Sequence, residues 1–266
     1  MAHMNGVFYS KTLARPVHFT AVLCNDNAFG TEGNPHYKRQ TKNVYLLHGY
    51  SGTDTDWFTN VPLGDLANRY NVNFFMPCGD NSFYLDQPAT GFKYAQYVGC
   101  EFVEYTRKTF NLSTNRDDTY IGGLSMGGFG ALHTGLMFNE TFGRIIALSS
   151  ALIQNGLSQM KSGDDNGMAN YEYYRQMFGD LDQIGTSVNN PEFLAKKLVE
   201  AGAVIPEIYM ACGTEDFLFV PNNEFKKFLD SLNIPVTYFT GPGIHDFVFW
   251  RAQLSAGLEW ALGNEA

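Results

Sequence analysis

The fold is decided by the stretch Thr119-Tyr120-Ile121-Gly122-Gly123-Leu124-Ser125-Met126-Gly127-Gly128-Phe129-Gly130-Ala131-Leu132. An apolar run leads into Gly-x-Ser-x-Gly, and small and apolar residues at helical spacing follow, so the pattern predicts a strand, a sharp turn and a helix. This is the setting of a nucleophile elbow, where the serine adopts strained backbone angles and the residues two before and two after it must be very small. Gly123 and Gly127 meet that requirement. The same motif also occurs by chance in glycine-rich turns, where its serine has no chemical role.

Composition limits the classes of protein to consider. The chain has 266 residues, 44% of them hydrophobic and 17% charged, which is enough for one large α/β domain or two small ones. A formal net charge of -9 and the lack of a basic cluster argue against a nucleic-acid partner. We find no apolar run of membrane-spanning length and no signal-peptide pattern, and we therefore expect a cytoplasmic protein with no membrane partner. Residues 1–4 are interpreted as a cloning remnant, so the predicted domain is 5–266.

The four cysteines and the histidines do not indicate a metal. Cysteines stand at positions 24, 78, 100 and 212, far apart and without a C-x-x-C pair, and no His or Cys pair has ligand spacing. We therefore expect free, reduced thiols and no zinc site.

The order of apolar runs predicts an α/β fold with a mainly parallel sheet of roughly eight strands, flanked by helices. An antiparallel pair opens the chain, and buried strands then alternate with helices. An insertion over 151–205 breaks this alternation and is predicted to form a small cap above the carboxyl ends of the strands, where ligands bind in such sheets. The expected strands are Phe8–Ser10, Val17–Cys24, Val44–Leu47, Val72–Pro77, the apolar run that leads into Ser125, Arg144–Ser150, Glu207–Cys212 and Pro235–Thr240. The expected helices are Leu63–Tyr70, Tyr97–Phe110, the one after Ser125, Ala169–Phe178, Pro191–Ala201, Asn222–Leu232 and Phe249–Leu262.

A nucleophilic serine needs a histidine base and an acid that orients it, and both should follow strand ends. Only two histidines follow Ser125 in the chain. His133 falls within the helix after the elbow, whereas His245 lies on a glycine-rich loop after a predicted strand and is the better candidate. Glu215 and Asp216 both follow the strand that ends at Cys212, and their neighbourhood does not separate them. Asp246 is read as a solvated or loop-ordering group.

The reaction also needs two backbone amides directed at the oxyanion. One comes from the residue after the nucleophile, Met126, and the other from the loop after the third strand. That loop begins His48-Gly49-Tyr50, which makes the Tyr50 amide the second donor and gives His48 a loop-ordering role.

With these motifs in hand, the chain resembles the esterase D family of serine esterases. The matching motifs are the elbow, Leu47-His48-Gly49, Gly213-Thr214-Glu215-Asp216, Phe178-Gly179-Asp180-Leu181 and Gly243-Ile244-His245-Asp246-Phe247-Val248-Phe249-Trp250. The resemblance covers nearly the whole chain and implies the α/β-hydrolase fold, with Asp216 as the acid and the Tyr50 position as an oxyanion donor. Asp80-Asn81-Ser82-Phe83-Tyr84 is similar to the family's loop near the acyl pocket, and Trp57 to its tryptophan after the glycine loop. The substrate-binding candidates are Trp57, Ser82, Tyr84, Tyr174 and Trp250.

The resemblance implies a serine carboxylesterase that hydrolyses short acyl or hydroxycinnamoyl esters, feruloyl and acetyl esters among them, through an acyl-enzyme. Such small-molecule esters can derive from the plant cell wall, and no metal or organic cofactor is needed. S-Formylglutathione hydrolase, an acyltransferase and a non-catalytic binding module remain the alternatives. Members of this family often self-associate, so a homo-oligomer is also an expectation. Four aromatic residues and one methionine of the cap fit either a substrate wall or the cap's own small core: Tyr171, Tyr173, Tyr174, Phe178 and Met177.

Overall fold

A computed structural model describes residues 1–26 and 31–263, so the last three residues of the predicted domain lie outside the described part. Eight strands form one sheet in the order β1-β2-β4-β3-β5-β6-β7-β8. The pairs β1/β2 and β2/β4 are antiparallel, and every pair from β4/β3 to β7/β8 is parallel. The predicted antiparallel opening followed by a parallel sheet is therefore confirmed.

Most strand bounds lie within two residues of the predicted ones. The exception is β1, which begins at Ala2 and pairs residue by residue with β2, so residues 2–4, which we assigned to a cloning remnant, are part of the sheet. The interior strands β3, β4 and β5 are buried along their whole length. The strands are β1 Ala2–Ser10, β2 Arg15–Leu23, β3 Lys42–Leu47, β4 Val72–Pro77, β5 Thr119–Leu124, β6 Arg144–Leu148, β7 Glu207–Gly213 and β8 Val236–Gly241.

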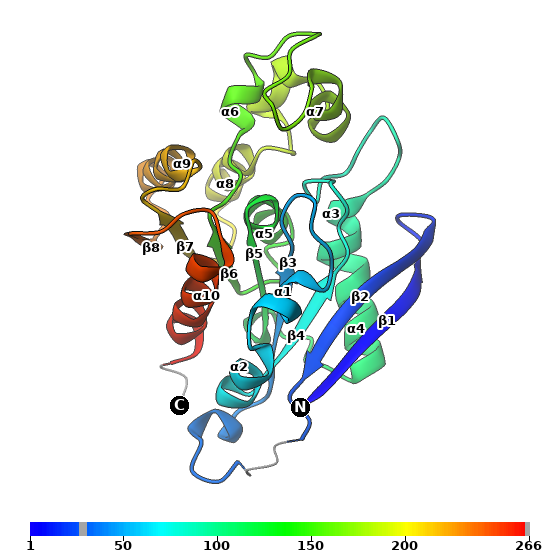
Figure 1. Cartoon of the computed structure of the whole chain (residues 1–266), viewed down its shortest axis with the longest axis vertical. Helices are drawn as coiled ribbons and strands as arrows, with labels where there is room; N and C mark the ends of the chain where they lie inside the picture. Colours follow the sequence, from blue (N-terminus) through cyan, green and yellow to red (C-terminus); the bar gives the residue numbers. More distant parts are fainter. Residues whose placement is uncertain (27–30, 264–266) are drawn as a thin grey trace.

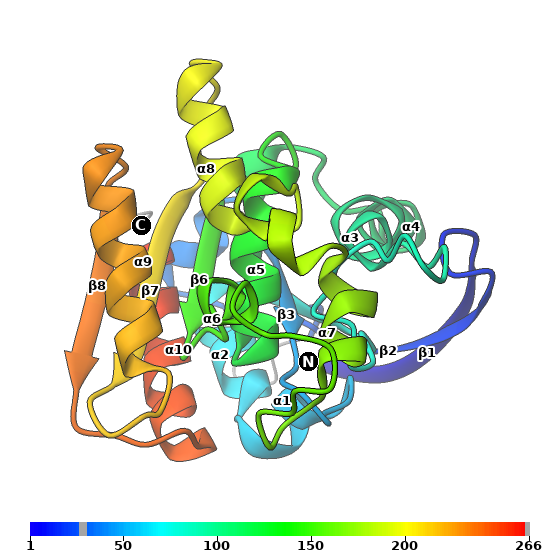
Figure 2. The ribbon, with the colours of Figure 1, turned by 90° about the horizontal axis from the view of Figure 1, so that it is seen from above.

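Helices cover both faces of the sheet (Figure 2). Each face has its own apolar core, because residues in a strand point alternately to either side. One face carries α1 (Asp56–Asn60), α2 (Leu63–Tyr70) and α10 (Phe247–Leu262). The other carries α3 (Tyr94–Gln96), a π-helical turn at Tyr97–Glu101, α4 (Phe102–Phe110), α5 (Met126–Met137), α8 (Pro191–Glu200) and α9 (Phe219–Ser231). The sequence did not predict α1, whose five residues are too few to show a helical period.

The cap is shorter than predicted. Between β6 and β7 the helices α6 (Gln154–Leu157) and α7 (Tyr171–Phe178) and a 3₁₀ segment, Leu181–Thr186, stand above the carboxyl ends of the strands (Figure 1). Helix α8 instead packs against α5 and α9. It therefore belongs to the helical layer of the sheet, and the predicted cap boundary at residue 205 falls too late in the chain.

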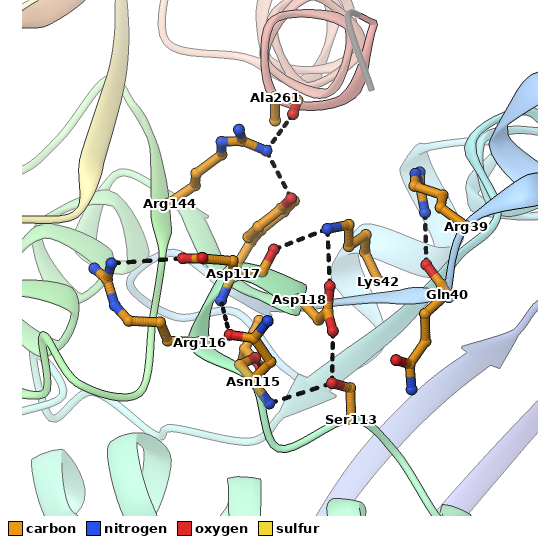
Figure 3. A network of polar contacts seen from close by, with 12 residues as sticks. Arg39, Gln40, Lys42, Ser113, Asn115, Arg116, Asp117, Asp118, Arg144 and Ala261 are labelled. Atoms are coloured by element: carbon orange, nitrogen blue, oxygen red, sulfur yellow. Dashed lines mark hydrogen bonds and ion pairs between the residues drawn. The ribbon is translucent and has the colours of Figure 1, made fainter. Parts of the chain in front are cut away.

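The amino-terminal edge of the sheet, opposite the cap, is held by a polar network (Figure 3). Lys42 at the start of β3 pairs with Asp118 just before β5, with 2.8 Å between Nζ and Oδ1, and the Ser113 hydroxyl donates to the other carboxylate oxygen. The Arg144 guanidinium, at the start of β6, donates to the Tyr120 hydroxyl and to the Ala261 carbonyl of α10. These contacts tie loops and a helix to the strand starts.

Candidate active site

Ser125 sits in a strained turn between β5 and α5. Its backbone angles are φ 55° and ψ -119°, a region of the Ramachandran plot that residues other than glycine rarely adopt. The glycines on either side make this turn feasible. A Cβ added to Gly123 would lie 2.2 Å from the Gly127 carbonyl oxygen, and one added to Gly127 would lie 2.2 Å from the Leu47 carbonyl oxygen. The sharp strand, turn and helix that the sequence predicted are therefore present, with the serine side chain at the carboxyl edge of the sheet.

His245 is hydrogen-bonded on both ring nitrogens. Its Nε2 lies 2.9 Å from the Ser125 Oγ, and its Nδ1 lies 2.8 Å from Oδ2 of Asp216. Because a carboxylate only accepts, Nδ1 carries a proton and Nε2 is free to accept one from the serine hydroxyl. The residues come from three different loops of the sheet's carboxyl edge, so folding alone brings them together.

The structure separates the two acids that the sequence left open. Asp216 is buried and accepts hydrogen bonds from His245, from the Leu218 amide at 2.8 Å and from the Ser149 hydroxyl. Burial opposes its ionisation, but these donors outweigh burial and hold the Asp216 pKa below its ordinary value. Glu215 points to solvent and accepts from the Gly243 amide at 2.6 Å.

Glu215 takes part in the hydrogen bonds that join the loop after β7, which carries Asp216, to the loop after β8, which carries His245. Its own amide donates to the Gly243 carbonyl at 3.1 Å, and the Thr214 amide donates to the Gly241 carbonyl at 2.9 Å. The Asp246 carboxylate accepts from the Phe249 amide and caps the start of α10, which is a loop-ordering contact. These bonds fix His245 relative to Asp216.

The Ser149 hydroxyl and the Trp250 indole form a chain of hydrogen bonds that ends on Asp216. The Trp250 Nε1 donates to the Ser149 Oγ at 3.0 Å, and the Trp250 ring stands perpendicular to the His245 ring with 4.8 Å between centroids. An indole nitrogen can only donate, so the Ser149 hydroxyl must accept from Trp250 and use its own hydrogen toward Asp216. No sequence pattern pointed to Ser149, because a serine at a strand end is common.

The loop after β3 is pinned beside the serine. The His48 ring is buried, its Nδ1 donates to the Gly49 carbonyl at 2.8 Å and its Nε2 accepts from the Gly79 amide at 2.9 Å. Burial lowers the His48 pKa and favours this neutral form. A Cβ added to Gly49 would lie 3.5 Å from the Ser125 Cβ, so the loop that carries the Tyr50 amide runs directly past the nucleophile.

A cavity of about 770 Å³ opens above Ser125. Its lining joins the two predicted oxyanion donors, Tyr50 and Met126, to cap residues and to the loop after β7. Phe83 and Tyr174 line it as buried side chains, whereas Phe217 and Met168 line it as exposed ones. The lining residues are Tyr50, Phe83, Ser125, Met126, Ala151, Ile153, Asn166, Gly167, Met168, Tyr174, Phe217, Leu218 and Pro221.

Of the five predicted substrate-binding residues, Tyr174 lines this cavity and the other four are not among its lining residues. The Trp57 indole donates to the Leu47 carbonyl at 3.0 Å, and the Tyr84 hydroxyl donates to the His48 carbonyl at 3.0 Å. The Ser82 hydroxyl donates to the Gly79 carbonyl, and Trp250 supports Ser149. Their contacts are with the loops that shape the site.

His133, the second histidine after Ser125, lies elsewhere. It is buried in α5, its Nε2 lies 2.9 Å from the Val188 carbonyl oxygen, and burial lowers its pKa to about 4. It therefore ties α5 to the segment before α8 and does not reach the serine. Cap residue Tyr173, which the sequence left between a wall and a core role, donates to the Asn81 carbonyl at 2.7 Å and so joins α7 to the loop after β4.

The described residues offer neither a metal site nor a membrane-spanning helix. No group of three or more His, Cys, Asp or Glu side chains gathers there as a metal would require, and all four cysteines are free. No helix in residues 1–26 and 31–263 is long and apolar enough to cross a membrane.

Comparisons with known proteins identify the family and the fold of this chain. A family model with the description "Putative esterase" matches residues 33–261. The acetyl esterase of Caldicellulosiruptor saccharolyticus is 41% identical over 260 residues, which is 98% of both chains. Among solved structures, the fluorophosphonate-binding serine hydrolase FphF of Staphylococcus aureus is similar, with a TM-score of 0.84, 27% identity and 98% of both chains covered. The S-formylglutathione hydrolase FrmB of the same organism gives a TM-score of 0.81 and 26% identity, again over 98% of both chains.

The fold is thus that of the α/β-hydrolases, with a mixed, mostly parallel sheet. More particularly, the chain belongs to the esterase family, and it is an enzyme that hydrolyses carboxylic esters.

Proposed function

We propose that this esterase hydrolyses short-chain acyl esters, acetyl esters foremost, with Ser125, His245 and Asp216 as its catalytic triad. The observation that carries the proposal is the pair of hydrogen bonds on His245, 2.9 Å to the serine and 2.8 Å to the aspartate. The acetyl esterase that is 41% identical supports the acyl group. The buried rings of Phe83 and Tyr174 in the cavity wall support a short acyl chain, because they leave that side closed.

The mechanism follows from the geometry. His245 Nε2 takes the proton of Ser125 Oγ as that oxygen attacks the ester carbonyl, and Asp216 stabilises the imidazolium that forms. The amides of Tyr50 and Met126 stabilise the oxyanion, a contribution worth roughly 3 kcal/mol for each donor. The imidazolium then gives its proton to the leaving alcohol, and the acyl group stays on the serine. Water, deprotonated by His245, attacks the acyl-enzyme and releases the acid and the free serine.

The lining of the cavity disfavours the thioester alternative. Glutathione carries two carboxylates and would need cationic partners, but no Lys or Arg is among the cavity residues in the described part of the chain. A hydroxycinnamoyl group remains the second acyl candidate, because the cavity of about 770 Å³ exceeds the needs of an acetyl group.

The test is a panel of p-nitrophenyl acetate, butyrate and octanoate, methyl ferulate and S-formylglutathione, with wild type and Ser125→Ala. We expect the highest kcat/KM with the acetate and a loss of at least ~10³-fold in the variant. Labelling of the wild type by a fluorophosphonate, absent from Ser125→Ala, would identify the nucleophile directly. Equal activity of the two proteins would contradict the triad, and a preference for methyl ferulate or S-formylglutathione would contradict the acyl assignment.

A further inference from the structure

Two aromatic rings contact His245, and they differ in exposure. Trp250 is 6% exposed and its nitrogen is bonded to Ser149, so it closes one side of the imidazole. Phe217 lies 4.6 Å from the His245 ring between centroids, is 63% exposed and lines the cavity. Of these two sides of the histidine, only the Phe217 side is therefore open to a bound molecule.

Exposed apolar side chains concentrate around this opening. Of the nine large apolar side chains that are more than half exposed in the described part of the chain, Met168 and Phe217 line the cavity. Three more lie close to it along the chain: Val220 precedes the cavity residue Pro221, and Ile244 and Val248 flank His245. Single exposed apolar residues are ordinary, but a group of them beside a cavity marks a binding surface. We call Phe217, Val220, Ile244 and Val248 the apolar rim.

The apolar rim is built on a rigid base. Phe217 and Ile244 belong to two loops that are joined by the hydrogen bonds between Glu215 and Gly243. Val220 stands in the first turn of α9 and Val248 in the first turn of α10. A preformed apolar surface binds without the cost of ordering its side chains first.

The position of the rim assigns it to one half of the substrate. His245 must pass a proton to the leaving oxygen, so the alcohol moiety lies beside this ring, where Phe217 is the open neighbour. We propose that the apolar rim is a subsite for the alcohol moiety of the ester, and that it takes an uncharged alcohol with a flat apolar face, such as an aryl-methyl alcohol. This inference rests on the proposed function, because it assumes that His245 is the proton donor.

The chemistry of the rim argues against polar alcohols. The cavity residues on this side are Phe217, Leu218 and Pro221, which offer no polar side-chain atom. The nearby Glu215 carboxylate is already bonded to the Gly243 amide and the Thr214 hydroxyl. A sugar would leave most of its hydroxyls unpaired against such a surface, and that costs affinity.

The experiment compares benzyl acetate with ethyl acetate, which share the acyl group and have alkyl-type leaving groups. We expect wild type to prefer benzyl acetate about tenfold in kcat/KM, the gain expected when roughly 60 Å² of apolar surface is buried. Phe217→Ala and Val248→Ser should each reduce this ratio, the former to about twofold. The ratio within each variant cancels any effect on steps that both esters share. Val204→Ser is the control, because Val204 is also a valine that is more than half exposed but it precedes β7 at the opposite edge of the sheet.

Three results would overturn the subsite. One is a ratio that is the same in wild type and both rim variants. Another is a Phe217-dependent preference for an acetylated methyl xyloside over benzyl acetate, which would make the rim a sugar site. The third is a dimer in sedimentation velocity that Val248→Ser dissociates without a change in the ratio, since the rim would then contact a second copy. Activity that survives Ser125→Ala would instead refute the proposed function, so the two failures are distinguishable.

Discussion

Two buried carboxylates stand at opposite edges of the sheet and are held in different ways. Asp118, at the amino-terminal edge, pairs with the Lys42 ammonium and accepts from Ser113. Asp216, at the carboxyl edge, pairs with the His245 imidazole and accepts from the Leu218 amide and Ser149. For both groups burial opposes ionisation, and the donors outweigh it and lower the pKa.

The difference lies in the partner. The Lys42 ammonium bonds both to the Asp118 carboxylate and to the Asp117 carbonyl, so this pair holds the strand starts together. The partner of Asp216 is the His245 ring, whose other nitrogen lies 2.9 Å from the Ser125 Oγ, so in the proposed mechanism Asp216 faces a group that takes up and returns a proton. The same kind of buried acid is thus placed for stability at one edge and, in the proposed mechanism, for chemistry at the other.

The largest expected effect tests the chemical edge. Asp216→Asn should lower kcat for p-nitrophenyl acetate by ~10⁴-fold, because the amide neither selects the His245 tautomer nor stabilises the imidazolium. Glu215→Gln, the adjacent exposed acid, is the control and should stay within about fivefold, as expected for one weakened hydrogen bond. Equal losses in the two variants would show that both acids act only through the loop.

The structural edge should respond in stability. Asp118→Asn leaves the Lys42 ammonium without its carboxylate, and we expect it to lower the free energy of unfolding by about 2 kcal/mol with kcat unchanged. Urea denaturation and the p-nitrophenyl acetate assay measure the two quantities on the same samples. A loss of kcat with unaltered stability would remove the distinction between the edges.

This variant should also change the pH dependence of stability. Because the pKa of Asp118 is lowered on folding, the unfolded chain binds the proton first as the pH falls. The stability from this group is therefore complete above the ordinary pKa of aspartate and is lost below it, as the pH falls through the folded value. Urea midpoints of wild type should decline more steeply through that range than those of Asp118→Asn.

A smaller effect is expected at Ser149. Ser149→Ala removes one donor to Asp216 and leaves the Trp250 nitrogen unpaired, which should lower kcat about tenfold, in line with one lost bond to a charged group. The pKa of Asp216 then rises, so kcat/KM should begin to fall at a higher pH on acidification. Ser149→Thr restores the hydroxyl and should rescue the pH profile of kcat/KM. If Ser149 served only for packing, Ser149→Ala would leave this pH profile unshifted and Ser149→Thr would not restore activity.

Local patterns in the sequence were sufficient for much of this molecule. Gly123 and Gly127 indicated the elbow, because no side chain fits where the two backbone segments cross. The bounds of α2 and β4 agree with the predicted ones, because each element has a clear apolar pattern. His245 could be chosen because it alone follows both Ser125 and a late strand. These features depend on neighbours in the chain, so local patterns were enough for the fold class and for selecting Ser125 and His245 as the candidate nucleophile and base.

Tertiary structure decided what depends on distant neighbours. Glu215 and Asp216 are adjacent and both acidic, and only the packing of the acid loop turns Asp216 toward His245 and Glu215 toward solvent. Trp250 resembled a substrate contact until its nitrogen was placed on Ser149, 101 residues earlier in the chain. The exposure of Phe217 beside the histidine has no periodic signal at all. Hydrogen-bond direction and burial belong to pairs of residues brought together by the sheet, and for that physical reason no local pattern contains them.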